Sequence, residues 1–457
     1  MSNPHDVDVI VVGAGFAGVT AARELRRQGH RVLVLEARDR IGGRTWTDTR
    51  LGRDLEMGGT WVHWIQPHTW AELTRYGIGV TPSPVPVKGY WTSGGTVHSG
   101  TAEDLLGLID RGMGASTAEA LTHFPQPYQP LLAGRSLAEV DRISIREKLE
   151  QVGLSAEEFD AVEGMWATNF SGRTEDGGYA QALRWCALAG GSWQLMFEAC
   201  ATYKVVGGTR RLIEAMTADA GVEIRTRARV AAVAQDDTGA TVTLEDGTTL
   251  TAAAVVVTLP LNVLDSVTFD PPLSEGKRRA AHQGQASQGV KVWARLRGEH
   301  EPFVALGPGS GPLTLCQVEY VGDGETVVVA FGSVSERLDG SDRAAVQDAL
   351  RTWLPDVEVL EVASHDWVSD ELAGETWPMQ RAGQLTGALA ELQRPEGRVF
   401  IAGSDYADGW AGFIDGAIES GMRAGRDVHA LLTSSASVPA DAPALTVLKN
   451  DHPEEST

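Results

Sequence analysis

The sequence predicts an α/β fold in which a mostly parallel sheet is assembled from separated segments of the chain and an α+β domain is inserted between them. Three features predict this fold. The segment Val7–Val12 is a short apolar run typical of a buried parallel strand, and a helical pattern and a second strand follow it. Strand periodicity returns at 222–260. A further apolar strand at 398–402 and a long helical pattern at 414–432 come near the end of the chain.

The first elements form a β-α-β unit at residues 7–36, in which the helical pattern spans 19–27 and the second strand spans 31–35. Residues 45–100 are rich in Gly, Pro and Trp, and we expect mostly irregular structure there. A helical region follows. In it, apolar residues at helical spacing come after Ser155, which begins a capping-box pattern with the glutamate three positions later.

The strands of 222–260 are separated by turn sequences, Asp-Asp-Thr-Gly at 236–239 and Asp246-Gly247, which are typical of hairpins. Residues 290–378 alternate between strand patterns and one helix near 342–354. The tail, residues 434–457, is rich in Ser, Pro and Ala and then charged, and we expect it to be disordered.

Composition excludes several classes of protein. The formal net charge is -22, and no basic stripe is visible, so a nucleic-acid partner is not expected. Three cysteines without C-x-x-C spacing indicate neither a disulfide framework nor a zinc site, which is typical of the reducing cytoplasm. The longest later apolar stretch, 252–264, is interrupted by Pro260 and is too short to span a bilayer. We therefore expect a soluble, cytoplasmic protein without a membrane partner.

A glycine loop lies between the first predicted strand and helix. In Gly13-Ala14-Gly15-Phe16-Ala17-Gly18, the first glycine permits a tight turn, Gly15 lets a pyrophosphate approach the backbone, and Gly18 lets helix and strand pack closely. The N-terminus of the following helix then faces the phosphates. Glu36 ends the second strand at the position where an acidic side chain binds ribose hydroxyls. Together these features predict a Rossmann-like dinucleotide site.

The segments after Glu36 distinguish between cofactors. Residues 36–44 read Glu-Ala-Arg-Asp-Arg-Ile-Gly-Gly-Arg, and Arg44 can reach a pyrophosphate. A second glycine pair follows in Gly58-Gly59-Thr60-Trp61, where a backbone could lie flat against an isoalloxazine ring. Here the sequence resembles the flavin-dependent amine oxidase family, whose fingerprint is a glycine loop, E-A-x-x-R-x-G-G-R and then G-G. Further matches lie at 207–209, 269–273, 401–405 and 412–417, and the resemblance reaches residue 432.

The resemblance implies FAD as the cofactor. It implies an FAD-binding domain at 1–80, 205–289 and 395–433 and a substrate-binding domain at 81–204 and 290–394. Thr376 stands where membrane-bound relatives attach flavin through cysteine, so the FAD is expected to be non-covalent. The final helix is expected to aim its N-terminus at the flavin N1/O2 edge, where reduced flavin carries negative charge. The implied cofactor contacts come from several segments: Gly13, Gly15, Phe16, Ala17, Gly18, Glu36, Ala37, Arg38, Gly43, Arg44, Gly58, Gly59, Thr60, Trp61, Val230, Trp367, Gly403, Ser404, Asp405, Gly412, Phe413, Ile414 and Ala417.

Three residues are candidates for catalysis. Strand alternation turns Lys291 to the face opposite Val290, where it could simply face solvent. The resemblance implies instead that it binds a water at flavin N5 and assists reaction with oxygen. By the same resemblance, Trp377 and Phe413 face each other across the flavin, guide the amine nitrogen and exclude water. Phe413 replaces the tyrosine often found there.

Within the family, the sequence is most similar to the bacterial 6-hydroxynicotine oxidase branch, at 288–291, 319–320, 365–367 and Asn169. In that branch an asparagine at the Asn169 position contacts the substrate ring, but Asn169 could equally cap its helix. The residues implied for substrate binding are Trp61, Trp166, Asn169, Trp377 and Phe413.

The resemblance implies an oxidase that takes hydride from the α-carbon of a primary or secondary amine to flavin N5. The imine then hydrolyses to a carbonyl compound, and molecular oxygen regenerates FAD with release of hydrogen peroxide. Two alternatives stay open: an amine dehydrogenase with another electron acceptor, and an amino-acid oxidase, which needs an arginine to bind a carboxylate. Arg184, Arg295 and Arg381 are available for that role. A homodimer is compatible with the sequence.

Overall fold

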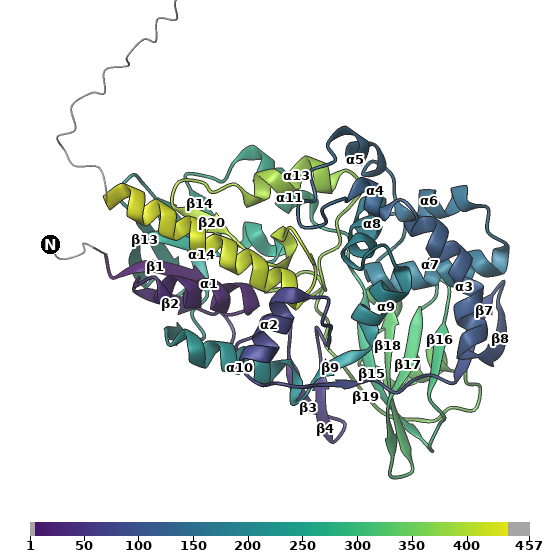
Figure 1. Ribbon diagram of the computed structural model, residues 1–457. Helices are drawn as coiled ribbons and strands as arrows, with labels where there is room; N and C mark the ends of the chain where they lie inside the picture. The colour runs from purple at the N-terminus through teal and green to yellow at the C-terminus, as the bar shows by residue number, and fades with distance from the viewer. Residues whose placement is uncertain (1–4, 437–457) are drawn as a thin grey trace, which may run out of the picture.

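Two large sheets form the framework of the protein, as the computed structural model shows for residues 5–436 (Figure 1). The first sheet has the order β10-β2-β1-β13-β12-β11-β14, and β20 also pairs with β13. Its strands come from three separated parts of the chain: β1 Val7–Val12, β2 Val32–Leu35, β10 Glu223–Arg225, β11 Val230–Gln235, β12 Ala240–Leu244, β13 Thr249–Val257, β14 Thr268–Asp270 and β20 Val399–Ile401. Strands β10, β2, β1, β13 and β20 pair in parallel, whereas β12 is antiparallel to both neighbours.

Both faces of the first sheet are covered, which explains why its central strands are continuously apolar. Val9 and Val11 point to one face and pack with helices α1 (Phe16–Arg27) and α14 (Ile414–Ala436). Ile10 and Val12 point to the other face. Helix α10 (Gly208–Ala220) packs beside α1, while α11 (Glu275–Gln283), α13 (Gln384–Gln393) and the 3-10 turn η1 (Leu261–Ser266) lie together. Helix α1 begins at Phe16, three residues before the predicted start.

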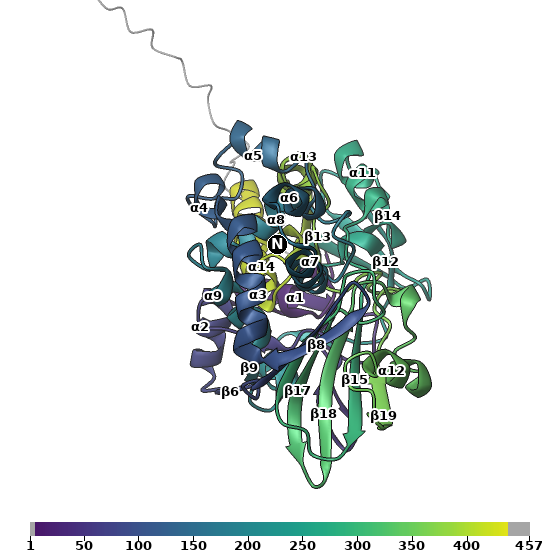
Figure 2. The ribbon, with the colours of Figure 1, turned by 90° about the vertical axis from the view of Figure 1, so that its right-hand side faces the viewer.

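The second sheet is mixed and has the order β19-β15-β18-β17-β16-β7-β8. Figure 2 shows α3 and α7 against it and α12 beside β15 and β19. Its register places Lys291 opposite Phe331, and Phe331 opposite Leu315 on the next strand. The strands are β7 Lys88–Ser93, β8 Thr96–Thr101, β15 Val290–Arg297, β16 Phe303–Leu306, β17 Leu315–Gly322, β18 Glu325–Gly332 and β19 Val359–Ser364.

The remaining helices mostly belong to the predicted helical region. The capping box at Ser155 is present at the start of α7, where Ser155 accepts from the Glu158 backbone N–H. The bounds are α3 Ala102–Thr117, α4 Ala120–His123, α5 Arg135–Val140, α6 Ile145–Val152, α7 Ala156–Phe170, α8 Tyr179–Leu188, α9 Trp193–Ala201, α12 Arg343–Leu350, η2 Ser335–Arg337 and η3 Ser404–Tyr406.

The expectation of mostly irregular structure at 45–100 is wrong. Short strands and one helix fill this segment: β3 pairs with β4 and β7 with β8 in local hairpins, whereas β5 and β6 both pair with the distant β9. Such long-range pairing leaves little periodicity in the sequence. The elements are β3 Thr47–Arg50, β4 Arg53–Glu56, β5 Trp61–Val62, α2 Pro67–Arg75, β6 Val80–Pro82 and β9 Tyr203–Val205, with β7 and most of β8 following.

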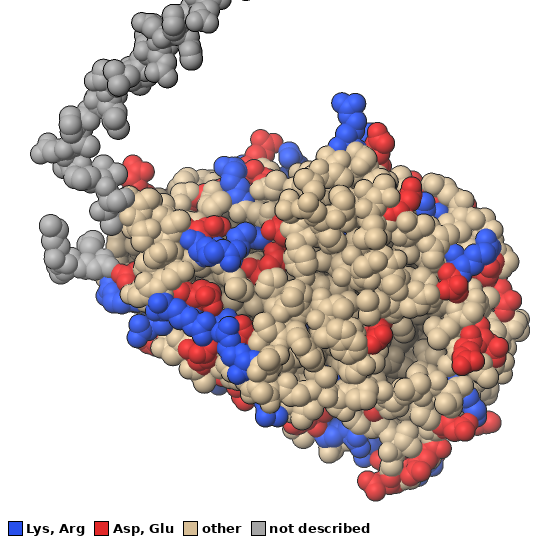
Figure 3. All heavy atoms as spheres, viewed as in Figure 1, with Lys and Arg blue, Asp and Glu red and all other residues tan. Residues whose placement is uncertain are grey.

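The end of the chain departs from expectation over a few residues. Helix α14 continues to Ala436, so residues 434–436 are helical, and the rest of the expected disordered tail lies outside the described residues. Within residues 5–436, no helix is long and apolar enough to cross a membrane. On the face shown in Figure 3, basic and acidic side chains are interspersed around a broad uncharged area, and no basic stripe crosses it.

Candidate active site

One long cavity runs from the carboxyl ends of β1 and β2 to the second sheet. Its walls include Gly15 and Glu36 from the first sheet and its loops, and Lys291 and Phe331 from the second. The carboxyl edge of a parallel sheet is the usual place for a nucleotide. The cavity therefore joins a nucleotide-type site to a pocket roofed by helices α7, α8 and α9.

The glycine loop has the shape that the sequence predicted. Gly13 has φ +102°, and a Cβ on Gly18 would lie 2.0 Å from the Gly13 carbonyl oxygen, so helix α1 and strand β1 touch there. A Cβ on Gly15 would meet only the Gly43 Cα, at 3.9 Å, which leaves its backbone open to the cavity. No side chain caps the α1 N-terminus, so its backbone N–H groups are free to bind phosphate oxygens.

Glu36 is held rigidly at the end of β2. Its Oε2 accepts from the Ala14 backbone N–H and its Oε1 from the Arg38 backbone N–H, both at 2.8 Å. The carboxylate also lines the cavity, near Val230. A fixed acidic acceptor at this edge fits a ribose, as predicted from the sequence.

Arg44 joins two carboxylates beneath the cavity floor. It donates to the side chains of Glu375 and Asp405, to the Ser404 Oγ at 3.1 Å and to the Thr376 carbonyl at 3.2 Å. Burial raises the pKa of Glu375, and the neighbouring Asp405 raises it further, so this carboxyl holds its proton. Burial also acts on Asp405, but Arg44 outweighs it and keeps the pKa of Asp405 low.

The Asp405 side chain is directed to Arg44 and not to the cavity. Arg44, Gly403 and Ser404 line the cavity, but Asp405 does not. Its Oδ1 accepts from the Leu261 backbone N–H at 3.0 Å, and its Oδ2 faces Arg44. Asp405 therefore positions Arg44, and its side chain is not part of the cavity lining.

Lys291 lies on β15, and its Nζ is buried. Its acceptors are the Glu56 carbonyl at 2.8 Å, the Gly58 carbonyl at 2.9 Å and the Thr60 Oγ1 at 2.5 Å. An ammonium has three N–H donors, so these contacts use all of them. Burial lowers the pKa of Lys291 to about 7. The solvent-facing alternative for Lys291 is excluded by its 8% exposure.

Trp377 and Phe413 line the same cavity as Lys291. The Trp377 Nε1 donates to the Asn169 carbonyl at 2.9 Å, which fixes the indole. Phe413 is held by edge contacts with Trp185 at 5.0 Å and Trp410 at 5.1 Å between ring centroids. Helix α14 begins directly after Phe413, so its N-terminus lies at this part of the wall.

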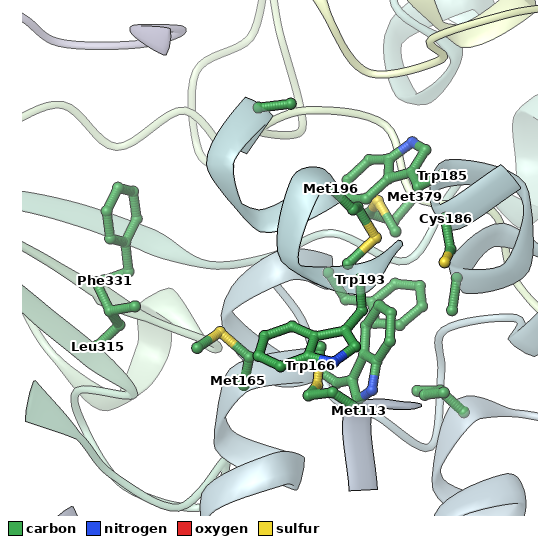
Figure 4. Close-up of a cluster of buried hydrophobic side chains, with 14 of the residues drawn as sticks. Met113, Met165, Trp166, Trp185, Cys186, Trp193, Met196, Leu315, Phe331 and Met379 are labelled. Carbon is green, nitrogen blue, oxygen red and sulfur yellow. The ribbon is translucent and has the colours of Figure 1, made fainter. Parts of the chain in front are cut away.

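The two candidate substrate residues on helix α7, Asn169 and Trp166, lie in different surroundings. Asn169 lines the cavity, and its Nδ2 has no partner although it is buried. The helix is capped by Ser171, which adopts the left-handed conformation, so the capping alternative for Asn169 is wrong. Trp166 does not line the cavity. It is fully buried, donates its Nε1 to the Ser116 Oγ and packs among methionines and tryptophans of the helical core, as Figure 4 shows.

Most of the residues expected at the cofactor line this cavity. Trp367 does so while donating its Nε1 to the Met57 carbonyl at 2.9 Å. Besides Asp405 and Trp166, Gly18 is the one expected residue that does not line the cavity, because it packs helix α1 against strand β1. The lining set is Gly13, Gly15, Phe16, Ala17, Glu36, Ala37, Arg38, Gly43, Arg44, Gly58, Gly59, Thr60, Trp61, Asn169, Val230, Lys291, Trp367, Trp377, Gly403, Ser404, Gly412, Phe413, Ile414 and Ala417.

Sequence reasoning missed several pocket residues. Leu315 and Gln317 on β17, Phe331 on β18 and Trp185 and Cys200 on α8 and α9 also line the cavity. The β17 segment carried a signal, because polar residues at 317 and 319 share one parity within an apolar strand. The helical residues gave none, since any core helix carries such side chains.

The fold and the cavity indicate a class: an enzyme that holds a nucleotide cofactor at one end of a cavity, with an aromatic pocket and the buried Lys291 at the other. The open glycine backbones, the uncapped α1 N-terminus, Arg44 and Glu36 fit the phosphates and ribose of FAD. Within residues 5–436, no group of three His, Cys, Asp or Glu side chains could hold a metal ion.

Comparison with known proteins gives the family. The sequence profile described as flavin containing amine oxidoreductase matches residues 16–429, and the chain belongs to that family. It is therefore an enzyme that uses FAD. The chain is similar, at 38% identity over 433 residues, to the pseudooxynicotine dehydrogenase of a Pseudomonas species, covering 93% of this chain and 87% of the relative. It is 32% identical over 452 residues to (S)-6-hydroxynicotine oxidase of Paenarthrobacter nicotinovorans, covering 93% and 100%.

A solved structure also has this fold. The structure is similar to that of a putrescine oxidase bound to putrescine, with a TM-score of 0.80 and 26% identity, covering 93% of this chain and 99% of that one.

Proposed function

We propose that the protein is an FAD-dependent amine oxidase. It takes hydride from the α-carbon of a primary or secondary amine, releases an imine that hydrolyses to a carbonyl compound, and passes the electrons to molecular oxygen to give hydrogen peroxide. One observation carries this proposal: Lys291, Trp377 and Phe413 line the same cavity as the glycine loop and Arg44. Amine substrate and cofactor would therefore meet between the two aromatic rings.

The residues that would hold FAD follow from the cavity. The glycine loop and Arg44 suit the pyrophosphate, Glu36 the ribose, Val230 the adenine, and the α14 N-terminus the flavin end. We propose that the FAD-binding domain comprises 1–80, 205–289 and 395–433, and the substrate domain 81–204 and 290–394. Cys200 is the one cysteine lining the described cavity, and burial raises its pKa to about 12, so it stays an unreactive thiol and the FAD is non-covalent.

The side chains of the pocket have different roles in the proposed reaction. FAD, when bound, accepts the hydride and later yields the electrons. Trp377 and Phe413 hold the neutral amine by their ring faces and keep water out. The fixed indole of Trp377 reduces the freedom of the bound amine, which raises the rate by orientation. Lys291, with a pKa near 7, provides a group beside the cavity that changes protonation at neutral pH.

The substrate is proposed to be an amine on a hydrophobic or cyclic group. The relatives act, by their names, on pseudooxynicotine and on (S)-6-hydroxynicotine. The walls at Trp61, Trp185, Phe331 and Trp377 suit such a group. Amino-acid oxidation is disfavoured, since none of the three arginines considered for a carboxylate lines the cavity: Arg184, Arg295 and Arg381.

An amine dehydrogenase with a non-oxygen acceptor is the second candidate. The relative at 38% identity is named a dehydrogenase. In addition, the Lys291 Nζ already contacts three protein acceptors, with which a water beside the flavin would have to compete. An oxidase would require Lys291 to release one of these bonds, for example the bond to Thr60.

The two candidates are separated by electron acceptors. The holoenzyme is reduced under nitrogen with a panel of cyclic and arylalkyl amines, and the bleached flavin is then mixed with air-saturated buffer, a redox dye or cytochrome c. Fast reoxidation by oxygen with peroxide release supports the oxidase, whereas slow reoxidation by oxygen and fast reduction of the dye or cytochrome supports the dehydrogenase. Failure of every amine to bleach the flavin contradicts both.

A further inference from the structure

A buried carboxylate outside the catalytic set controls one wall of the pocket. Strand β17 places Leu315 and Gln317 on one face, since alternate residues of a strand share a face, and Glu319 follows at a shift in the β17–β18 register. Glu319 is 2% exposed and forms an ion pair with the buried Lys204 of β9. A buried charge persists only when it is paired in this way.

Glu319 sets the direction of the Gln317 amide. The Gln317 Nε2 donates to the Glu319 Oε1 at 2.6 Å. An ionised carboxylate only accepts hydrogen bonds, so the flipped amide, with its oxygen toward Glu319, is excluded. Gln317 also lines the cavity. Among the described residues, no donor reaches its Oε1, so the carbonyl oxygen is the group that Gln317 has left for a ligand.

The same carboxylate orients an aromatic wall. The Ser83 Oγ donates to Glu319 at 3.0 Å and accepts from the Trp61 Nε1 at 3.3 Å. Trp61 lines the cavity and lies 5.3 Å from the Lys291 Nζ. Glu319 therefore holds two pocket residues without lining the pocket itself.

The sheet register places Gln317 away from the catalytic end. Lys291 and Leu315 flank Phe331 in one row, and Gln317 pairs with Val329 in the next row. The Cα atoms of Gln317 and Lys291 are offset by two strand spacings of about 4.8 Å and two residue rises of about 3.4 Å, which is a distance of roughly 12 Å across the sheet. The Gln317 carbonyl would thus meet the part of a substrate remote from its reacting nitrogen.

We propose that Gln317, oriented by Glu319 and Lys204, is a specificity residue that accepts a hydrogen bond from a neutral N–H or O–H group at the distal end of the substrate amine. This inference rests on the proposed amine oxidation and names its substrate class: monoamines with a distal neutral donor. A second ammonium is disfavoured, because the Glu319 charge is already neutralised by Lys204 and a buried cation would lack a counter-charge.

The test uses matched amines with one to three methylenes between ring and nitrogen: benzylamine, phenethylamine and 3-phenylpropylamine, each with and without a para-hydroxyl. Dissociation constants for the holoenzyme are measured under nitrogen by tryptophan fluorescence, and flavin bleaching is followed in the same samples. In at least one pair, the hydroxylated amine is expected to bind about tenfold more tightly, the value of one hydrogen bond.

The variants locate the effect. In Gln317→Leu the binding ratio of that pair is expected to fall to about one. In the double variant Lys204→Met/Glu319→Gln, which leaves no unpaired charge, the ratio should fall because the amide is free to flip. The exposed Gln151→Leu is the control and should keep the wild-type ratio.

Two results overturn the inference: no pair with a preference in the wild type, or a preference that Gln317→Leu keeps. Either result with a bleached flavin leaves amine oxidation intact. Conversely, absence of bleaching with a broad amine panel refutes the oxidation, while the binding ratio still reports on Gln317.

Discussion

The variant Arg44→Gln tests whether Arg44 stabilises the buried, ionised carboxylate of Asp405. In the native protein the proton on Glu375 and the charge of Arg44 allow two carboxyls to be buried side by side, with side chains 0% and 2% exposed. Without Arg44, Asp405 loses its counter-charge and its pKa should rise above the unfolded value of about 3.9. Removing one partner of a buried pair costs about 3–5 kcal/mol at neutral pH.

The sign of the pH effect follows from proton uptake. The folded variant would bind one more proton than the wild type at pH values between the unfolded and the raised pKa of Asp405. Its stability deficit therefore shrinks as pH falls, by at most about 1.4 kcal/mol per pH unit. An unfolding entropy of about 2.1 cal/mol/K per residue over 457 residues is about 1 kcal/mol/K, so the deficit at pH 8 is about 3–5 °C in Tm.

The assay is a series of melting curves at one scan rate, with saturating FAD, between pH 5 and pH 8. Arg44→Gln is compared with the wild type and with Arg50→Gln, which removes an exposed pair with Asp48 and a contact with the Trp46 ring but no buried ion pair. A deficit that is the same at every pH, or no deficit at all, refutes the idea that Arg44 stabilises an ionised Asp405.

Three further predictions concern the rest of the site. Gly18→Ala places a Cβ 2.0 Å from the Gly13 carbonyl oxygen and should lower FAD retention at least about tenfold. Gly107→Ala, with open space around the added Cβ, is the control. Full FAD retention by Gly18→Ala would contradict the packing argument. Lys291→Met removes a group whose pKa in the folded protein is about 7. The stability of the wild type relative to the variant should therefore rise by up to about 1.4 kcal/mol per pH unit from pH 7 to pH 10. Melting curves with a constant difference would show that the pKa of Lys291 is not lowered. Trp377→Leu should slow anaerobic flavin bleaching by amine about tenfold or more without loss of FAD, and an unchanged rate would remove Trp377 from the reaction.

The nucleotide half of the site was predictable from the sequence because it depends on the backbone. Gly13 must adopt a positive φ, Gly15 must stay open and Gly18 must touch a carbonyl, and only glycine satisfies all three over so short a loop. Glu36 follows at a distance set by one β-α-β unit. These requirements are local, so the residues that meet them form a recognisable motif.

The substrate half was predictable only in part. Lys291 was placed by strand alternation together with the family resemblance, but helical spacing could not distinguish Trp166, which packs in the core, from Asn169, which lines the cavity. The family resemblance implied a cofactor contact for Asp405, and only the structure shows that its carboxylate pairs with Arg44. Strands β5 and β6 left no clear pattern because their partner β9 lies far along the chain, and the local hairpins β3–β4 and β7–β8 were missed in a segment rich in Gly, Pro and Trp.

The sequence by itself determined that a dinucleotide cofactor binds, because phosphate and ribose recognition depends on backbone turns of a few residues, and the family resemblance identified that cofactor as FAD. Only the tertiary structure decided the shape and polarity of the pocket. Gln317, Trp61 and Lys291 come from three strands, and their directions depend on sheet register and on a buried ion pair between Lys204 and Glu319. Such long-range packing leaves no local pattern from which those contacts could be read.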